Sequence, residues 1–121
     1  MRRRLLSILT ATLFALALPA CLTIQRHSKS DPYAIHHHTW WNYYQRGRLH
    51  LRDGHFHEAQ ADFETALGLR PGARHPCAQE RWRARTYGMH IQESYFPHRE
   101  LAVCLLNLNQ PQKALELLEK S

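Results

Sequence analysis

The sequence lacks the short motifs on which most catalytic sites are built. Its 121 residues contain no H-E-x-x-H, no G-x-S-x-G, no paired C-x-x-C and no phosphate-binding glycine loop. The ten histidines are scattered, and nothing in their spacing requires any of them to meet. We therefore predict that the chain is not an enzyme and that it holds neither a cofactor nor a metal ion.

The chain also lacks an apolar run long enough for a comfortable transmembrane helix, which needs about 20 residues. Its longest apolar run, from Leu5 to Leu18, follows the basic residues Arg2, Arg3 and Arg4. A basic start followed by a short apolar segment is typical of an export signal. We predict a signal peptide over residues 1–20, with an uncleaved membrane anchor as the alternative.

The end of this leader, Leu18-Pro19-Ala20-Cys21, resembles the lipobox of bacterial lipoproteins. Pro19 departs from the usual small residue at that position. The resemblance implies that Cys21 is lipidated and becomes the first mature residue. It places the chain in the bacterial cell envelope as a membrane-anchored lipoprotein, at the periplasmic face of the outer membrane. The alternative is ordinary cleavage after Ala15-Leu16-Ala17, which would give a secreted or periplasmic protein.

Charge and cysteine content narrow the class of partner further. Removing the arginines of the leader lowers the formal net charge from +6 to +3, which is too mild to favour nucleic acid. Two cysteines, Cys77 and Cys104, follow Cys21. An oxidising compartment would permit a disulfide between them, and the alternative is that Cys104 is a small buried hydrophobe.

Residues 21–38 show no helical periodicity, and Asp31-Pro32 would break a helix. We interpret this stretch as a flexible tether. Three neighbouring histidines, His36, His37 and His38, would form no fixed coordination geometry in such a segment.

Helical periodicity begins after Thr39. On one side of a first helix lie Trp40, Tyr43, Tyr44, Gly47 and Leu51; on one side of a second lie Phe56, Ala59, Phe63, Ala66 and Leu67. Turn residues follow each run, Asp53-Gly54 and then Pro71-Gly72. The pattern predicts an antiparallel helical hairpin in which the small residues Gly47 and Ala59 permit close approach.

Residues 40–73 resemble the 34-residue tetratricopeptide repeat. The signature positions fall on Tyr43, Gly47, Gly54, Phe56, Ala59, Phe63, Ala66 and Pro71. Two positions depart from it: Arg46 replaces the usual aliphatic residue and His50 the usual aromatic one. A second, incomplete copy covers residues 95–121, after an insertion at residues 74–94. We therefore expect an all-α fold of about two repeats, the first over residues 39–73, behind the signal peptide and tether.

The second copy stops before the repeat pattern is complete. We therefore expect the chain to be an N-terminal fragment of a longer protein.

The resemblance implies that first-helix residues line the peptide-binding face of the array. These are Trp41, Tyr44, Arg48, Arg52 and Arg99, continued by Val103 and Leu106. Alternatively, Trp41 and Tyr44 pack on the insertion. Within the insertion, Arg81, Arg83 and Arg85 surround Trp82 in a patch that suits an anionic partner, or they pair with Glu80 and Glu93.

Together these features predict an envelope-anchored scaffold for protein–protein interaction. Its partners would be an unidentified protein or peptide, and a membrane through the lipid anchor, but no nucleic acid. The alternative function is an N-terminal adaptor of a larger envelope enzyme.

Overall fold

The computed structural model describes residues 30–121. The predicted signal peptide, Cys21 and the first half of the predicted tether, residues 21–29, lie outside these residues. Residues Pro32–Ser121 form one compact unit, and the description below concerns this unit. No helix within residues 30–121 combines the length and the apolar character that crossing a membrane requires.

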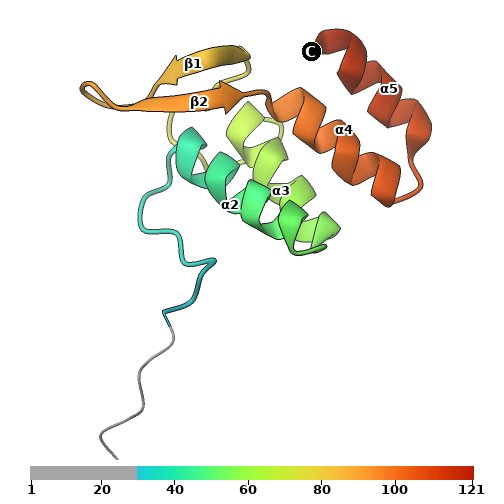
Figure 1. The fold of residues 1–121 in the computed structure, drawn as a ribbon, viewed down its shortest axis with the longest axis horizontal. Helices are drawn as coiled ribbons and strands as arrows, with labels where there is room; N and C mark the ends of the chain where they lie inside the picture. The colour runs from blue at the N-terminus through green and yellow to red at the C-terminus, as the bar shows by residue number, and fades with distance from the viewer. Residues whose placement is uncertain (1–29) are drawn as a thin grey trace, which may run out of the picture. The chain divides into compact units, whose positions relative to one another are not determined.

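Four helices and one β-hairpin make up the unit (Figure 1). The chain enters through a lead-in segment, residues 32–39, which runs beside the first helix. Helices α2 (Trp40–Arg52) and α3 (Phe56–Leu67) form the first helical hairpin. Strands β1 (Arg81–Arg85) and β2 (Ile91–Tyr95) follow, and helices α4 (Pro97–Asn107) and α5 (Pro111–Lys120) form a second helical hairpin. Helix α4 packs directly on α3, so the two helical hairpins are neighbours in space despite the insertion.

The close contact between α2 and α3 depends on Gly47, which has no side chain. A Cβ atom at Gly47 would lie 2.9 Å from Cε1 of Phe63 and 3.2 Å from Cβ of Asp62. Ala59 and Phe63 are fully buried. The predicted roles of Gly47, Ala59 and Phe63 in this hairpin are therefore confirmed.

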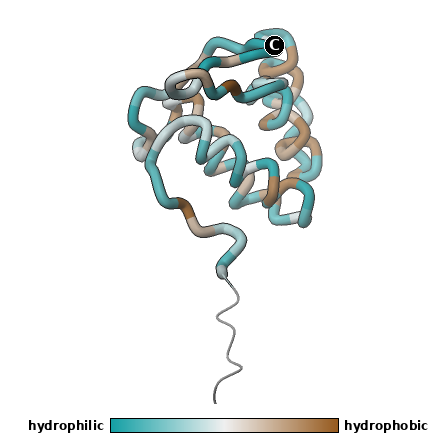
Figure 2. The backbone as a smooth tube through the Cα atoms, turned by 60° about the vertical axis from the view of Figure 1, so that its left-hand side comes forward, coloured by the Kyte–Doolittle hydropathy of each residue, from teal (hydrophilic) through white to brown (hydrophobic). Residues whose placement is uncertain are grey.

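The core begins as an aromatic cluster between α2 and the end of β2. Tyr44 is fully buried, with its ring centroid 4.7 Å from that of Tyr95 and 5.7 Å from that of Phe63. Trp40 lies 4.4 Å from Tyr95, also between ring centroids. Aliphatic residues continue the core along α4 and α5, whose hydrophobic residues are seen in Figure 2; they include Leu101, Ala102, Leu105, Ala114 and Leu117.

The expectation of an all-α fold is wrong for the insertion, because residues 81–95 form a two-stranded antiparallel sheet. The alternation of exposed and buried residues explains why this segment is a strand. Ala84 is buried while its neighbours Arg83 and Arg85 are exposed, as a half-buried strand requires. The strands are joined by a turn in which Gly88 adopts a φ of +53°, a left-handed conformation that favours glycine. The helical hairpins on either side remain consistent with tetratricopeptide architecture.

Within the part of the chain that the structure describes, Cys77 and Cys104 form no disulfide. Cys104 is buried between α4 and its neighbours, and Cys77 is half-buried. The alternative interpretation, in which Cys104 is a small buried hydrophobe, is the one that the structure supports.

Candidate functional site

The predicted peptide-binding residues divide between the surface and the core. Arg48 and Arg52 are exposed on α2, and Arg99 is exposed on α4. Trp41 is half-buried, with its ring centroid 5.9 Å from that of Tyr87 at the tip of the β-hairpin. Tyr44 is fully buried and does not belong to the surface.

Tyr44 connects the first helix to the insertion. Its hydroxyl donates a hydrogen bond to the carbonyl of Ser94 (2.7 Å) and accepts one from the backbone N–H of Phe96 (3.3 Å). Burial of the ring raises the pKa of this hydroxyl above its usual value. Both Trp41 and Tyr44 therefore contact residues of the β-hairpin or its junction with α4, as the alternative interpretation held.

The remaining surface residues form what we call the open face. Arg48 lies over the ring of Tyr44, with 5.9 Å from Cζ to the centroid, and Arg99 lies 4.6 Å over the ring of Phe96. Further along α4, Val103 and Leu106 have exposed fractions of 38% and 50%. Positions 99, 103 and 106 are spaced to share one side of a helix. We define the open face as Arg48, Arg52, Arg99, Val103 and Leu106, with Phe96 and Trp82 at its border.

Local pairing differs among these arginines. Arg52 pairs with Asp53 (2.9 Å) and Arg99 with Glu100 (3.2 Å). Within residues 30–121, no ion pair involves Arg48. Its guanidinium is consequently the cation of the open face that is most available to a ligand.

Phe96 is the member of this region that the sequence interpretation missed, and Trp82 was predicted as part of the patch in the insertion and not beside the open face. Their rings pack edge to face with centroids 4.9 Å apart, and Trp82 is 72% exposed. The signal was the alternation in "RWRAR", which places Trp82 on the opposite side of the strand from the arginines.

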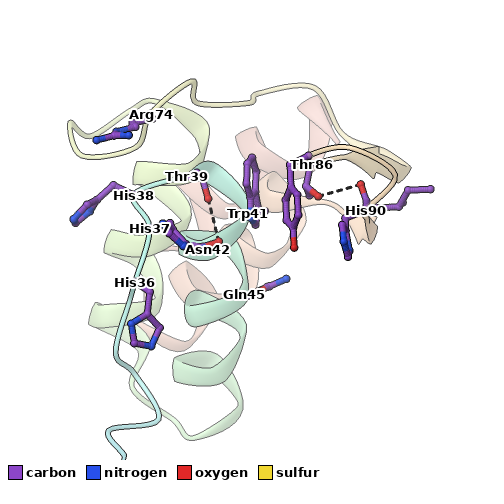
Figure 3. A pocket seen from close by; sticks show the side chains of 12 residues that line it. His36, His37, His38, Thr39, Trp41, Asn42, Gln45, Arg74, Thr86 and His90 are labelled. Atoms are coloured by element: carbon purple, nitrogen blue, oxygen red, sulfur yellow. Dashed lines mark hydrogen bonds between the residues drawn. The ribbon is translucent and has the colours of Figure 1, made fainter.

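A hollow of about 720 Å³ lies between the lead-in segment, α2 and the tip of the β-hairpin (Figure 3). His36, His37 and His38 approach from the lead-in segment, and Thr86 and His90 from the hairpin, with Trp41 between them. None of the described residues that line this hollow carries a carboxylate. Among the described residues, no group of three metal-ligating side chains is arranged to hold an ion.

The two departures from the repeat pattern converge on one buried carboxylate. Arg46 makes a bidentate pair with Asp62, with distances of 2.8 and 2.7 Å. His50 lies beside the same carboxylate (3.8 Å) and stacks on Tyr33 of the lead-in segment, with ring centroids 4.2 Å apart. These residues fix the lead-in segment against α2 and form no open site.

The architecture defined by these contacts is a stack of helical hairpins with one exposed, arginine-bearing face. Stacked helical hairpins are the building units of helix-repeat proteins. Within this stack, residues 42–72 match the family model of the tetratricopeptide repeat. No curated protein and no solved structure matches the chain. The family match covers the first helical hairpin and the turn after it.

Proposed function

We propose that the chain is a protein-interaction scaffold that binds an extended segment of a partner protein on the open face. The observation that carries this proposal is the tetratricopeptide repeat at residues 42–72, because such repeats are generally non-catalytic modules that bind proteins. The exposed stripe on α4 and the arginines of α2 provide a surface of the required kind.

The chemistry of the open face favours a segment that mixes acidic and apolar residues. Guanidinium groups bind carboxylates through paired hydrogen bonds, and Arg48 has no such partner among the described residues. Val103 and Leu106 offer exposed apolar surface further along the face. Aromatic and arginine side chains at the Trp82 border are the types that contribute most to binding at protein interfaces.

We further propose that a lipid on Cys21 anchors this scaffold in the bacterial cell envelope. The support is the order of the leader: arginines, a short apolar run and then Leu18-Pro19-Ala20-Cys21. Mass spectrometry of the membrane fraction should detect an acylated N-terminal peptide that begins at Cys21. A Cys21→Ser chain that is still processed and still bound to the membrane would contradict this part of the proposal.

Selection from a library of displayed peptides would test the binding function. The bait is the chain with Cys21→Ser, so that no lipid interferes. We expect the selected peptides to bind the Arg48→Glu, Arg99→Glu double variant at least about tenfold more weakly, because each substitution replaces attraction by repulsion.

Lys113→Glu, Lys120→Glu is the matched control. Lys113 and Lys120 are exposed cations on α5, outside the open face, so their reversal changes the net charge by the same amount without changing the proposed site. If the double variant and the control bound the selected peptides equally well, the open face would not be the binding site.

A further inference from the structure

We propose that the outer edge of strand β1 binds an extended acidic segment of a partner protein, which joins the β-hairpin as a third strand. This edge lies in the insertion and not on the open face. The inference therefore goes beyond the function proposed above and does not depend on it.

The side chains of β1 present positive charge on one side of the sheet. Arg81, Arg83 and Arg85 alternate along the strand and are all exposed. With Ile91 they line a hollow of about 550 Å³. Arg81 donates a hydrogen bond to the side chain of Gln79, whereas no ion pair within residues 30–121 involves Arg83 or Arg85. The interpretation in which these arginines pair with Glu80 and Glu93 is not what the structure shows.

The two acidic residues near these arginines, Glu80 and Glu93, form no ion pair with them. Glu80 accepts hydrogen bonds from the backbone of His98 (2.8 Å) and from the hydroxyl of Ser121 (2.6 Å). Glu93 is opposite Arg83 in the strand register, but no ion pair joins the two. Even counting Glu93, this side of the sheet keeps an excess of positive charge.

The backbone of β1 is available on the same edge. The N–H of Thr86 donates to the carbonyl of His90 (3.0 Å), so this pair is hydrogen-bonded. Hydrogen-bonded and non-hydrogen-bonded pairs alternate along an antiparallel ladder. The Arg83↔Glu93 and Arg85↔Ile91 pairs are therefore of the second kind. Their arginine N–H and C=O groups point away from β2, towards the outer edge.

The arginine side chains and the outward backbone groups of β1 together specify the residue pattern of the partner strand. A strand that hydrogen-bonds to Arg83 and Arg85 would place its opposite side chains on the same side of the sheet as the guanidiniums, about 5 Å away between Cβ atoms. Acidic residues at every second position would then meet the arginines one by one. Peptide addition to a sheet edge is a common mode of recognition, with the backbone giving affinity and the side chains specificity.

Two other occupants, a second copy of this chain and an anionic lipid, fit the edge of β1 less well. A second copy of β1 would bring arginine against arginine, a repulsion by which natural edge strands avoid self-association. Anionic lipid head groups would satisfy the guanidiniums but would leave the outward N–H groups of Arg83 and Arg85 without a strand. An acidic peptide satisfies both sets of groups.

The test uses the full chain carrying Cys21→Ser and a synthetic peptide, acetyl-Thr-Glu-Val-Glu-Val-Glu-Thr-amide, labelled for fluorescence anisotropy. We expect binding that weakens about tenfold or more in the Arg83→Glu, Arg85→Glu variant. The amide protons of Arg83 and Arg85 should exchange more slowly with solvent when the peptide is bound. The slower exchange of the Arg83 and Arg85 amides should persist in the Arg48→Glu, Arg99→Glu variant, which separates this proposal from any binding of the peptide at the open face.

Two modified peptides test the backbone pairing without changing the protein. N-methylation of the glutamate amides removes the donors that would face β1, and we expect binding to be lost. N-methylation of the valine amides alters the other edge of the peptide and should leave binding intact. Equal binding of both peptides, or binding to phosphatidylglycerol vesicles without binding to the parent peptide, would overturn the proposal.

Discussion

At the scale of single residues, Asp62 connects the first helical hairpin to the segment before it. Its side chain is 5% exposed and accepts both hydrogen bonds of the Arg46 fork. His50 lies against it and against Tyr33, whose hydroxyl donates a hydrogen bond to Asp53 (2.7 Å). The carboxyl group is thus buried and shared by two side chains.

Asp62→Asn should lower the free energy of unfolding by about 1–3 kcal/mol, because it leaves a half-buried guanidinium without its carboxylate. Glu64→Gln is the matched control: it breaks the pair between Glu64 of the same helix and Arg70, which lies beyond the end of that helix and has a side chain that is 53% exposed. An exposed pair contributes about 0–1 kcal/mol. Urea unfolding of both variants measures the difference, and equal losses would show that Asp62 has no special role.

The stability of the chain should fall as the pH is lowered through the range below about 6.5, the ordinary pKa of histidine. Burial lowers the pKa of His50, although Asp62 acts in the opposite direction. Since the folded state binds the proton less readily than the unfolded state, the stability is fully present above 6.5 and is lost below it.

His50→Phe should reduce this loss and keep the ring stacked on Tyr33. The measurement is the free energy of unfolding of both chains at pH 8 and pH 5.5. The nearby charged groups, Arg46, Asp62, Glu58 and His55, stay the same in the comparison. An identical fall in both chains would mean that other groups cause it.

At the scale of elements, the closest contact between helices is the one at Gly47. Gly47→Leu should destabilise the chain by about 1–3 kcal/mol, because the added side chain meets the ring of Phe63. His57→Leu adds the same side chain at an exposed position of the partner helix α3 and should change stability by no more than about 0.5 kcal/mol. Thermal or urea unfolding distinguishes them, and the reverse order would mean that α2 and α3 pack through other faces.

Helical spacing was sufficient to predict the elements on either side of the insertion. Trp40, Gly47, Ala59 and Phe63 carry the packing pattern within one hairpin, where each contact is local. The insertion was harder, because its strands are short and its buried residues, such as Ala84 and Gln92, are not strongly hydrophobic. The packing of Tyr44 on residues fifty positions away was predicted only as the alternative, because a contact of that range is not fixed by local spacing. The repeat positions named the arginines, Val103 and Leu106 of the open face, whereas Phe96 was missed and Trp82 was assigned to a separate patch in the insertion.

The hydroxyl of Tyr95 ties the end of β2 to the loop before β1 through a hydrogen bond to the carbonyl of Cys77. Burial raises the pKa of this hydroxyl, so it remains a donor at any physiological pH. Tyr95→Phe should therefore cost about 1–3 kcal/mol, the effect of leaving a buried acceptor unpaired. Tyr87→Phe, at the exposed hairpin tip, should be nearly neutral in the same urea experiment. A neutral Tyr95→Phe would mean that water replaces the bond.

At the scale of the whole molecule, the reactivity of the two cysteines measures how readily the packed helices separate. Burial raises the pKa of Cys104 to about 12, and its side chain has no exposed surface. Only a thiolate reacts readily with thiol reagents. In a Cys21→Ser chain at pH 8, Cys77 should be labelled before Cys104, and Cys104 only when α4 and α5 separate. Urea below the unfolding midpoint should accelerate the second labelling selectively; simultaneous labelling would contradict the packing around α4.

The bond from Tyr44 to Ser94 also bears on the order in which the protein is made and folds. Helices α2 and α3 leave the ribosome together, and the contacts between them close short loops. The residues that cover Tyr44 are synthesised fifty positions later. Long-range contacts form late because a long loop must first be closed. We therefore expect the nascent first hairpin to pass through a stage in which Tyr44 and Trp40 face the solvent, until Tyr95 emerges and seals them.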